Sequence, residues 1–182
     1  EERLKTAELI RPILRGRDIK RYSYEFAEQY IIATFPSKQY NIEDYQSLKS
    51  YLLSYGIEKL EQTGKKYFIN GEIVKARKKT NNKWFETQDS ISYWDEFSKP
   101  KIVWGNLNTS GNFAIAPEGM FINAPACMLI PGNNYLLAVL NSKIADYYIR
   151  TLGVVRNGGF FEYKPMFIEQ IPIPKITEEQ EA

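Results

Sequence analysis

Residues 134–152 read Asn-Tyr-Leu-Leu-Ala-Val-Leu-Asn-Ser-Lys-Ile-Ala-Asp-Tyr-Tyr-Ile-Arg-Thr-Leu and carry the clearest helical pattern of the sequence. Apolar side chains recur there at the three- and four-residue spacing of one helix face, with polar residues between them. Asn133 or Asn134 is a suitable N-cap, and Gly153 is a suitable end. The pattern predicts one amphipathic helix over these residues.

A second helical pattern covers residues 42–62, with Asn41 as its N-cap and a bend expected at Gly56. Short runs of β-branched and aromatic residues predict extended segments elsewhere. These runs are residues 30–35, 67–69, 102–104, 113–115, 121–122, 127–130, 160–161 and 168–173. Because strands and helices do not alternate as they do in a parallel sheet, we expect an α+β fold, with a mixed, largely antiparallel sheet and two main helices.

The length of 182 residues allows one sizeable core or two small ones. We expect an α+β core over residues 1–132, and a C-terminal helix with short strands over residues 133–182, packed on or beside it as one structural unit. No run approaches the ~20 apolar residues of a membrane span, so we expect no membrane partner. Because the first residue is Glu1 rather than Met, we also expect the chain to be part of a longer protein.

The residue types exclude several kinds of site. With no His and one cysteine, Cys127, the chain can form neither an internal disulfide nor a thiolate metal site, and the cysteine usage fits a reducing cytoplasm. Glu72 and Lys75 superficially offer the acid and lysine of a nuclease, but residues three apart on a strand face opposite sides. The glycine and serine motifs of nucleotide-binding and hydrolase sites are absent. We therefore expect no catalytic residue and no metal site in this chain.

Positive charge is concentrated in two places. The chain has 24 basic and 22 acidic residues, but five of the acids lie at its ends, at positions 1, 2, 178, 179 and 181, which leaves 17 acids for the body. The basic excess lies in residues 11–21 and 75–83. Clustered positive charge is typical of a nucleic-acid-binding surface. The alternative interpretation is that each cluster is merely a solvated loop.

Four segments, in this order along the chain, resemble the TaqI-like C-terminal specificity domain of type IIG restriction enzymes and adenine-N6 DNA methyltransferases. They are Ile-Arg-Pro-Ile-Leu-Arg-Gly-Arg-Asp-Ile-Lys-Arg-Tyr at 10–22, Lys-Pro-Lys-Ile-Val-Trp at 99–104, Tyr-Leu-Leu-Ala-Val-Leu-Asn-Ser-Lys at 135–143, and Phe-Glu-Tyr-Lys-Pro at 161–165 with Ile-Pro-Ile-Pro at 171–174. Each segment is ordinary by itself, whereas their ordered combination is specific.

The resemblance implies a target-recognition domain that lies against the major groove of double-stranded DNA. It implies a bacterial, cytoplasmic restriction–modification enzyme, active in phage defence, whose methyltransferase or nuclease portion precedes this segment and is its second partner. It implies no cofactor in this chain, with S-adenosylmethionine, and Mg²⁺ as a further candidate, in the parent enzyme. Neither the target sequence nor whether the parent cuts DNA follows from these residues.

Two sets of residues are expected to contact DNA. Basic side chains hold phosphates, and planar polar or cationic groups read base edges. The phosphate set is Arg15, Arg17, Lys20, Arg21, Lys78 and Lys79, and the base set is Arg77, Asn81, Asn82, Lys83, Asn106, Asn108 and Asn112.

Some of these residues also have a structural interpretation. Arg17 and Asp18 could form a local ion pair that fixes a turn, and Asn81 and Asn82 could be turn formers. Asn141 and Ser142 are expected to serve packing or capping instead of DNA.

Two other functions remain open at this stage. The chain could be a protein-interaction module in which the predicted helix at 135–152 docks on a methyltransferase or partner subunit. It could also bind single-stranded nucleic acid by stacking bases on its aromatic side chains.

Overall fold

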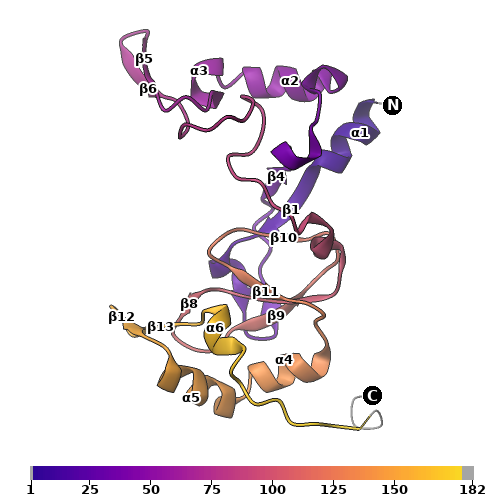
Figure 1. Ribbon diagram of the computed structural model, residues 1–182, viewed down its shortest axis with the longest axis vertical. Coiled ribbons are helices and arrows are strands. Elements are labelled where there is room, and N and C mark those ends of the chain that lie inside the picture. The colour runs from indigo at the N-terminus through magenta and orange to yellow at the C-terminus, as the bar shows by residue number, and fades with distance from the viewer. Residues whose placement is uncertain (1, 178–182) are drawn as a thin grey trace. The chain divides into compact units, whose positions relative to one another are not determined.

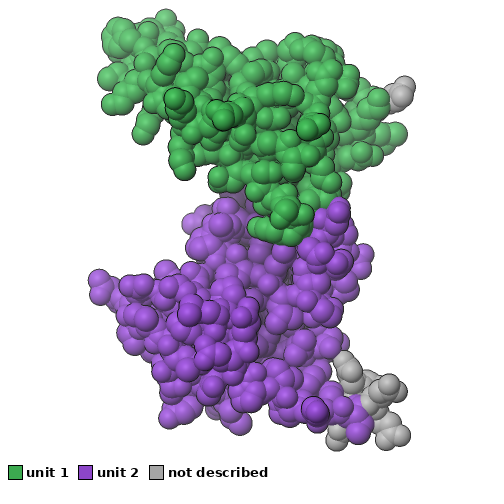
Figure 2. All heavy atoms as spheres, in the orientation of Figure 1, with its two compact units in different colours: residues 1–11, 30–94 green, residues 12–29, 95–182 purple. Residues whose placement is uncertain are grey.

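A computed structural model describes residues 2–177 (Figure 1). The chain divides into two compact units (Figure 2): unit 1 holds residues 1–11 and 30–94, and unit 2 holds residues 12–29 and 95–182. Of the terminal acids noted above, those at positions 1, 178, 179 and 181 lie outside the described residues. The division at residue 132 that the sequence suggests is a different partition and stays a prediction.

Unit 1 combines short helices and one hairpin with long segments that have no regular structure. A core of Leu9, Ile42, Leu48 and Phe85 joins the N-terminal helix to the middle of the unit. The elements are α1 (Glu2–Leu9), β4 (Tyr30–Ile32), 3₁₀ turns at Pro36–Lys38 and Ile42–Asp44, α2 (Gln46–Leu53), α3 (Ile57–Leu60), β5 (Lys66–Ile69) and β6 (Glu72–Lys75), and β1 (Ile10–Leu14) begins here.

The β5–β6 hairpin follows from its turn residues. Asn70 and Gly71 both have positive φ, 52° and 87°, as a two-residue hairpin turn of the primed type requires. The two strands pair from Lys66 opposite Lys75 to Ile69 opposite Glu72. The predicted strand at 67–69 is therefore confirmed, and its partner is the segment just after the turn.

Up to residue 177, unit 2 forms small sheets and three α-helices. Its central sheet is antiparallel in the order β11-β7-β9, β13 pairs with both β12 and β8, β2 pairs with β3, and β10 lies parallel to the end of β1. The elements are a 3₁₀ turn at Gly16–Asp18, β2 (Ile19–Lys20), β3 (Ser23–Tyr24), a 3₁₀ turn that begins at the end of unit 1 (Trp94–Ser98), β7 (Lys101–Trp104), β8 (Leu107–Asn108), β9 (Phe113–Ala116), β10 (Phe121–Ile122), β11 (Cys127–Leu129), α4 (Asn134–Leu140), α5 (Lys143–Leu152), β12 (Val155–Arg156), β13 (Phe160–Glu162) and α6 (Pro165–Ile168).

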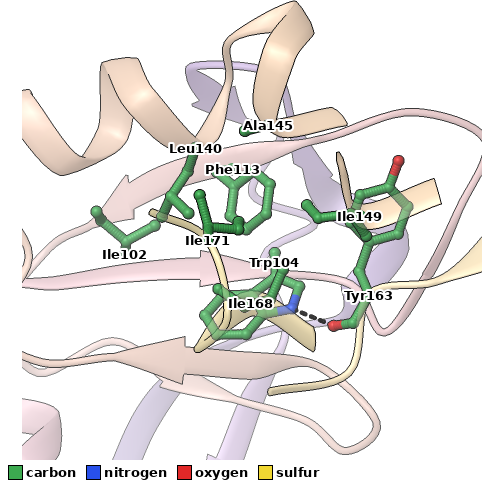
Figure 3. Close-up of a cluster of buried hydrophobic side chains, with 9 residues drawn as sticks. All are labelled: Ile102, Trp104, Phe113, Leu140, Ala145, Ile149, Tyr163, Ile168 and Ile171. Carbon is green, nitrogen blue, oxygen red and sulfur yellow. Dashed lines mark hydrogen bonds between the residues drawn. The ribbon is translucent and has the colours of Figure 1, made fainter. Parts of the chain in front are cut away.

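Strand β7 is buried on both faces, because successive strand residues point to opposite sides. Ile102 and Trp104 belong to the cluster under α4 and α5, whereas Val103 belongs to a second cluster on the other side. Figure 3 shows the first cluster, in which the Trp104 indole N–H donates to the Tyr163 carbonyl at 2.6 Å. This bond satisfies the polar atom of a buried tryptophan and ties β7 to the C-terminal segment.

Lys101, which opens β7, is fully buried. Its ammonium donates to the carbonyls of Phe97 at 2.7 Å and Pro117 at 2.9 Å, so the charge meets oriented dipoles instead of a carboxylate. Burial lowers the pKa of Lys101, because water no longer stabilises the ammonium. This lysine of the 99–104 segment therefore holds two loops of unit 2 and is not exposed to a ligand.

The fold class is confirmed: the described residues form an α+β structure with several small sheets, most of them antiparallel.

The helix predicted at 134–152 is wrong in one respect, because the segment forms two helices, α4 and α5. Asn141 ends α4, since its Oδ1 accepts from the Phe113 N–H and its Nδ2 donates to the Phe113 carbonyl at 2.9 Å. The Ser142 hydroxyl then accepts from the Ala145 N–H and caps α5, so the packing and capping roles expected for both residues are confirmed.

Other boundaries also need correction. The helix predicted at 42–62 is a 3₁₀ turn followed by α2 and α3, separated near Gly56, whose φ of 89° interrupts a helix. Asn41 does cap the 3₁₀ turn, by accepting from Glu43. The strand predicted at 30–35 ends at residue 32. In the segment 168–173, Ile168 ends α6, a turn and a bend follow, and residues 172 and 173 belong to no strand.

Candidate nucleic-acid interface

The first cluster of predicted contact residues forms a compact turn in unit 2, which we call the basic turn (residues 15–21). Arg15 lies across this turn and donates to both carboxylate oxygens of Asp18, at 2.8 and 2.7 Å. The Arg15 N–H also donates to Asp18, and the hydrogen bonds from Arg15 hold the pKa of the buried Asp18 below its ordinary value. The charge of Arg15 is therefore neutralised inside the turn.

The ion pair expected for Arg17 and Asp18 thus forms with Arg15 instead, and Arg17 is exposed. Lys20 is also exposed, and its ammonium donates to the Arg17 carbonyl and lies 3.7 Å from Glu25. The Arg21 guanidinium donates to the Asn141 carbonyl at 2.8 Å and lies 5.0 Å from the Tyr22 ring centroid. Three cations of the predicted phosphate set therefore face solvent on this turn, two of them with partners in unit 2.

The basic turn packs against the loop that carries three predicted base-contacting asparagines, which we call the amide loop (residues 105–112). A Cβ added to Gly16 would lie 3.3 Å from Gly105 Cα, and one added to Gly105 would lie 3.2 Å from the Gly16 carbonyl oxygen. These distances are tighter than most Cβ contacts in proteins, so a side chain at either position would push the two backbones apart by a few tenths of an ångström. The structure therefore brings the two predicted sets of unit 2 together.

The asparagines of the amide loop differ in what their side chains do. Asn108 donates to the Gly105 carbonyl at 2.7 Å, and its position is thereby fixed. Asn112 is half-buried, and the Asn106 Oδ1 atom is buried without a hydrogen-bond partner among residues 2–177. Asn108 and Asn112 are thus partly accessible on a fixed backbone.

A carboxylate in α5 anchors the amide loop. Asp146 accepts from the Gly111 N–H at 2.7 Å, from the Tyr163 hydroxyl and from Arg150 Nε at 2.8 Å. Burial alone would raise the pKa of Asp146, but these donors outweigh it and the pKa is lowered. Arg150 also donates to the Thr109 carbonyl, so one ion pair holds the loop at two points.

Sequence reasoning missed Asp146, Arg150 and Tyr163 as positioning residues. A signal was present, since an acid and an arginine four residues apart on a helix form an ion pair. The helix pattern does not show that Asp146 also accepts from Gly111 in the amide loop, 35 residues earlier in the chain.

The second predicted cluster, residues 75–83 of unit 1, is called the basic segment. Arg77 lies inward and donates to the carbonyls of Leu60 at 2.8 Å, Glu86 at 2.9 Å and Trp84. No acid of residues 2–177 forms an ion pair with it, and burial lowers its pKa. Its donors are committed to the backbone, so a contact of Arg77 with a base stays an untested prediction.

The residues after Arg77 alternate between side chains that are bonded within unit 1 and side chains that are exposed. Thr80 anchors them through its hydroxyl, which donates to Gln62 Oε1 at 2.7 Å. Lys78, Lys79 and Asn81 are exposed. The Asn82 side chain donates to the backbone at 2.9 and 3.1 Å and closes a turn, as its structural interpretation expected, while the exposed Lys83 donates to the Tyr40 carbonyl at 3.3 Å.

The two clusters lie in different units, and each carries exposed cations beside exposed or half-exposed amides. Such a combination suits a polyanion with hydrogen-bonding edges, because cations meet phosphates and amides meet bases. Among the described residues, no helix has the length and apolar character needed to cross a membrane.

Comparison with known proteins supports the resemblance seen in the sequence. The family model described as the TaqI-like C-terminal specificity domain matches residues 11–173, which include both clusters and the amide loop. No curated protein matches the chain. The match covers most of the 182 residues. The chain therefore belongs to the family of TaqI-like C-terminal specificity domains.

Proposed function

We propose that this chain reads the base sequence of double-stranded DNA on behalf of a bacterial restriction–modification enzyme of type IIG. Membership in the specificity-domain family associates it with DNA recognition in type II restriction–modification, and such C-terminal domains are in general non-catalytic. The observation that carries the proposal is the pair of exposed lysines, Lys78 and Lys79, held on a backbone fixed by Arg77 and Thr80.

In this proposal the predicted contact residues divide by what their side chains already bind. Arg17, Lys20 and Arg21 of the basic turn, with Lys78 and Lys79, hold phosphates. Asn81, Asn108 and Asn112 are the first candidates for base edges, followed by Lys83 and Asn106. Arg15, Arg77 and Asn82 position these groups, because their donors are occupied within the fold.

The chemistry of methylation belongs to another portion of the enzyme in this proposal. That portion binds S-adenosylmethionine and transfers the methyl group to adenine N6, and Mg²⁺ would serve a nuclease where the enzyme has one. The chain itself contributes orientation, because rigid contacts to a defined site place one base for reaction. Its other partner is then the methyltransferase portion.

Fluorescence anisotropy with a labelled duplex tests the proposal. The wild-type chain should bind with an affinity that falls steeply as salt is raised. Lys78→Ala with Lys79→Ala should weaken binding to all sequences and lower the salt slope by about two, since two phosphate contacts are lost. The matched control, Lys143→Ala with Lys175→Ala, removes the same charge from exposed lysines outside the clusters and should leave the slope unchanged.

A second candidate function is docking on a methyltransferase or partner subunit. The observation that favours it is the outer face of α5, where Ile144 is 82% and Tyr147 is 72% exposed. Absence of duplex binding at low salt, together with tight binding to a methyltransferase portion that is lost on Ile144→Ala with Tyr147→Ala, would establish docking in place of DNA recognition.

A further inference from the structure

The β5–β6 hairpin of unit 1 presents an unusual outer face. Phe68 lies directly opposite Ile73, and the two side chains are 78% and 70% exposed. Lys66 lies directly opposite Lys75, and both are exposed. Because the two pairs are two residues apart along each strand, all four side chains project from the same face of the ribbon.

The other face of the hairpin faces the rest of unit 1. Tyr67 and Val74 are half-buried, and the Tyr67 hydroxyl donates to Glu61. The ladder continues beyond the strands, since the Ala76 N–H donates to the Lys65 carbonyl at 2.9 Å and the Gly64 N–H to the Arg77 carbonyl at 2.8 Å. These hydrogen bonds hold the hairpin on unit 1, and the pairing register determines which side chains lie on its outer face.

Both pairs on the outer face are unfavourable in the free chain. Like charges directly opposite each other in an antiparallel pair repel, and an exposed phenylalanine beside an exposed isoleucine leaves apolar area in water. A partner that is both anionic and able to cover an apolar surface removes both costs. Duplex DNA has this chemistry, with phosphates at the rims of a groove and base edges and thymine methyl groups within it.

The surroundings of the hairpin match this partner. Residues 59–83 contain eight basic residues and two acidic ones, Glu61 and Glu72. Glu61 is engaged by Tyr67, and Glu72 pairs with Ile69 on the opposite face of the ribbon. The exposed Lys78 and Lys79 follow directly on the hairpin, so the positive charge is continuous with the basic segment.

We propose that the β5–β6 hairpin enters a groove of duplex DNA, with Lys66 and Lys75 on the phosphates and Phe68 and Ile73 against the bases. A two-stranded antiparallel ribbon has the width that the major groove admits. The inference rests on the proposed DNA recognition, and it adds an apolar, salt-independent contact that neither predicted set of residues supplies.

The test uses the full chain and labelled duplexes enriched by the wild-type chain from a pool with a randomised centre. Lys66→Ala with Lys75→Ala should weaken binding about tenfold and lower the salt slope by about two. Phe68→Ala with Ile73→Ala should weaken binding about tenfold with the slope unchanged, because no charge is lost. Lys66→Arg with Lys75→Arg should retain binding, since the charges remain.

The control is Ile144→Ala with Tyr147→Ala, an equally exposed apolar pair on α5, which should leave duplex binding unchanged. The unfolding free energy of each variant should stay within about 0.5 kcal/mol of the wild type, because the altered side chains are exposed. If wild-type binding depends on Lys78 and Lys79 but not on either hairpin pair, the inference is overturned and the proposed function stands.

Two further outcomes also decide the matter. A wild-type chain that binds no duplex at low salt overturns the proposed function and this inference together. Normal duplex binding by the Phe68→Ala, Ile73→Ala variant, with loss of its association with a methyltransferase portion, would make the hairpin a protein-docking element and overturn its assignment to DNA.

Discussion

The two basic regions each contain an arginine that turns inward, yet these arginines are compensated differently. Arg15 of unit 2 meets the buried carboxylate of Asp18, so the charges cancel inside the basic turn. Arg77 of unit 1 donates to backbone carbonyls instead, so its positive charge is retained. The difference indicates that the inward arginine adds no net charge to the basic turn, whereas it adds one positive charge to the basic segment.

The largest effect on stability is expected from Arg77→Met. This substitution keeps an unbranched side chain but leaves the Leu60 and Trp84 carbonyls without the donors that Arg77 gives them. We expect the free energy of unfolding to fall by about 2–4 kcal/mol, as for other buried polar networks broken on one side. Urea denaturation measures the change.

The neighbouring substitution Lys78→Met is the control for Arg77→Met. Lys78 is exposed, so its change should be within about 0.5 kcal/mol while duplex binding weakens. Equal stability changes at the two positions would show that Arg77 does not hold the segment, and the contrast between an inner arginine and outer lysines would fail.

The next effect is expected from Asp146→Asn, which weakens the anchor of the amide loop. The amide accepts less strongly from Gly111, Tyr163 and Arg150, so the unfolding free energy should fall by about 1–3 kcal/mol. Discrimination between the enriched and random duplexes should fall more than binding to random duplex, because the loop carries three amide side chains and no charged one. Anisotropy with both duplexes measures the ratio.

The same site predicts a dependence of stability on pH. The pKa of Asp146 is lowered in the folded chain, so its stabilisation is complete above the unfolded value near 3.8 and is lost as pH falls through the folded value. Wild-type stability should therefore drop more between about pH 5 and pH 2 than that of Asp146→Asn. Parallel pH profiles of the two proteins would contradict the anchor.

The smallest effect is expected from Lys66→Glu, which converts a like-charged cross-strand pair into an opposite-charged one. The hairpin should gain about 0.2–1 kcal/mol, while duplex binding weakens because a phosphate contact becomes repulsive. Thermal unfolding and anisotropy on one sample measure both. A variant that gains stability without losing affinity would separate the hairpin from DNA.

Local chemistry allowed parts of this fold to be predicted. The apolar run at 67–69 predicts its strand but not the hairpin partner, although Asn-Gly at 70–71 is itself a turn signal, because few residue pairs accept positive φ in succession. Strand β7 and helix α5 follow from apolar patterns, and the N-cap at Asn133, which accepts from Leu136 at 2.8 Å, follows from its side chain. The basic turn and basic segment are visible as charge clusters.

The remaining features depend on contacts between distant residues. The break between α4 and α5 arises because Asn141 bonds Phe113, which lies 28 residues away. Which cations point outward depends on partners such as Leu60 for Arg77, 17 residues away, and no local pattern distinguishes Arg77 from Lys78. The chain passes from one unit to the other after residues 11, 29 and 94. These boundaries likewise depend on long-range packing.

Selection from a duplex pool with a randomised centre tests the central claim most directly. After several rounds of binding and recovery by the wild-type chain, sequencing should show one enriched motif, and Asn108→Ala or Asn81→Ala should relax particular positions of it. Lys78→Ala with Lys79→Ala should lower recovery without changing the motif, since phosphate contacts carry no sequence information. A pool that stays random although the chain binds duplex, or a chain that retains no duplex at low salt, would contradict sequence recognition.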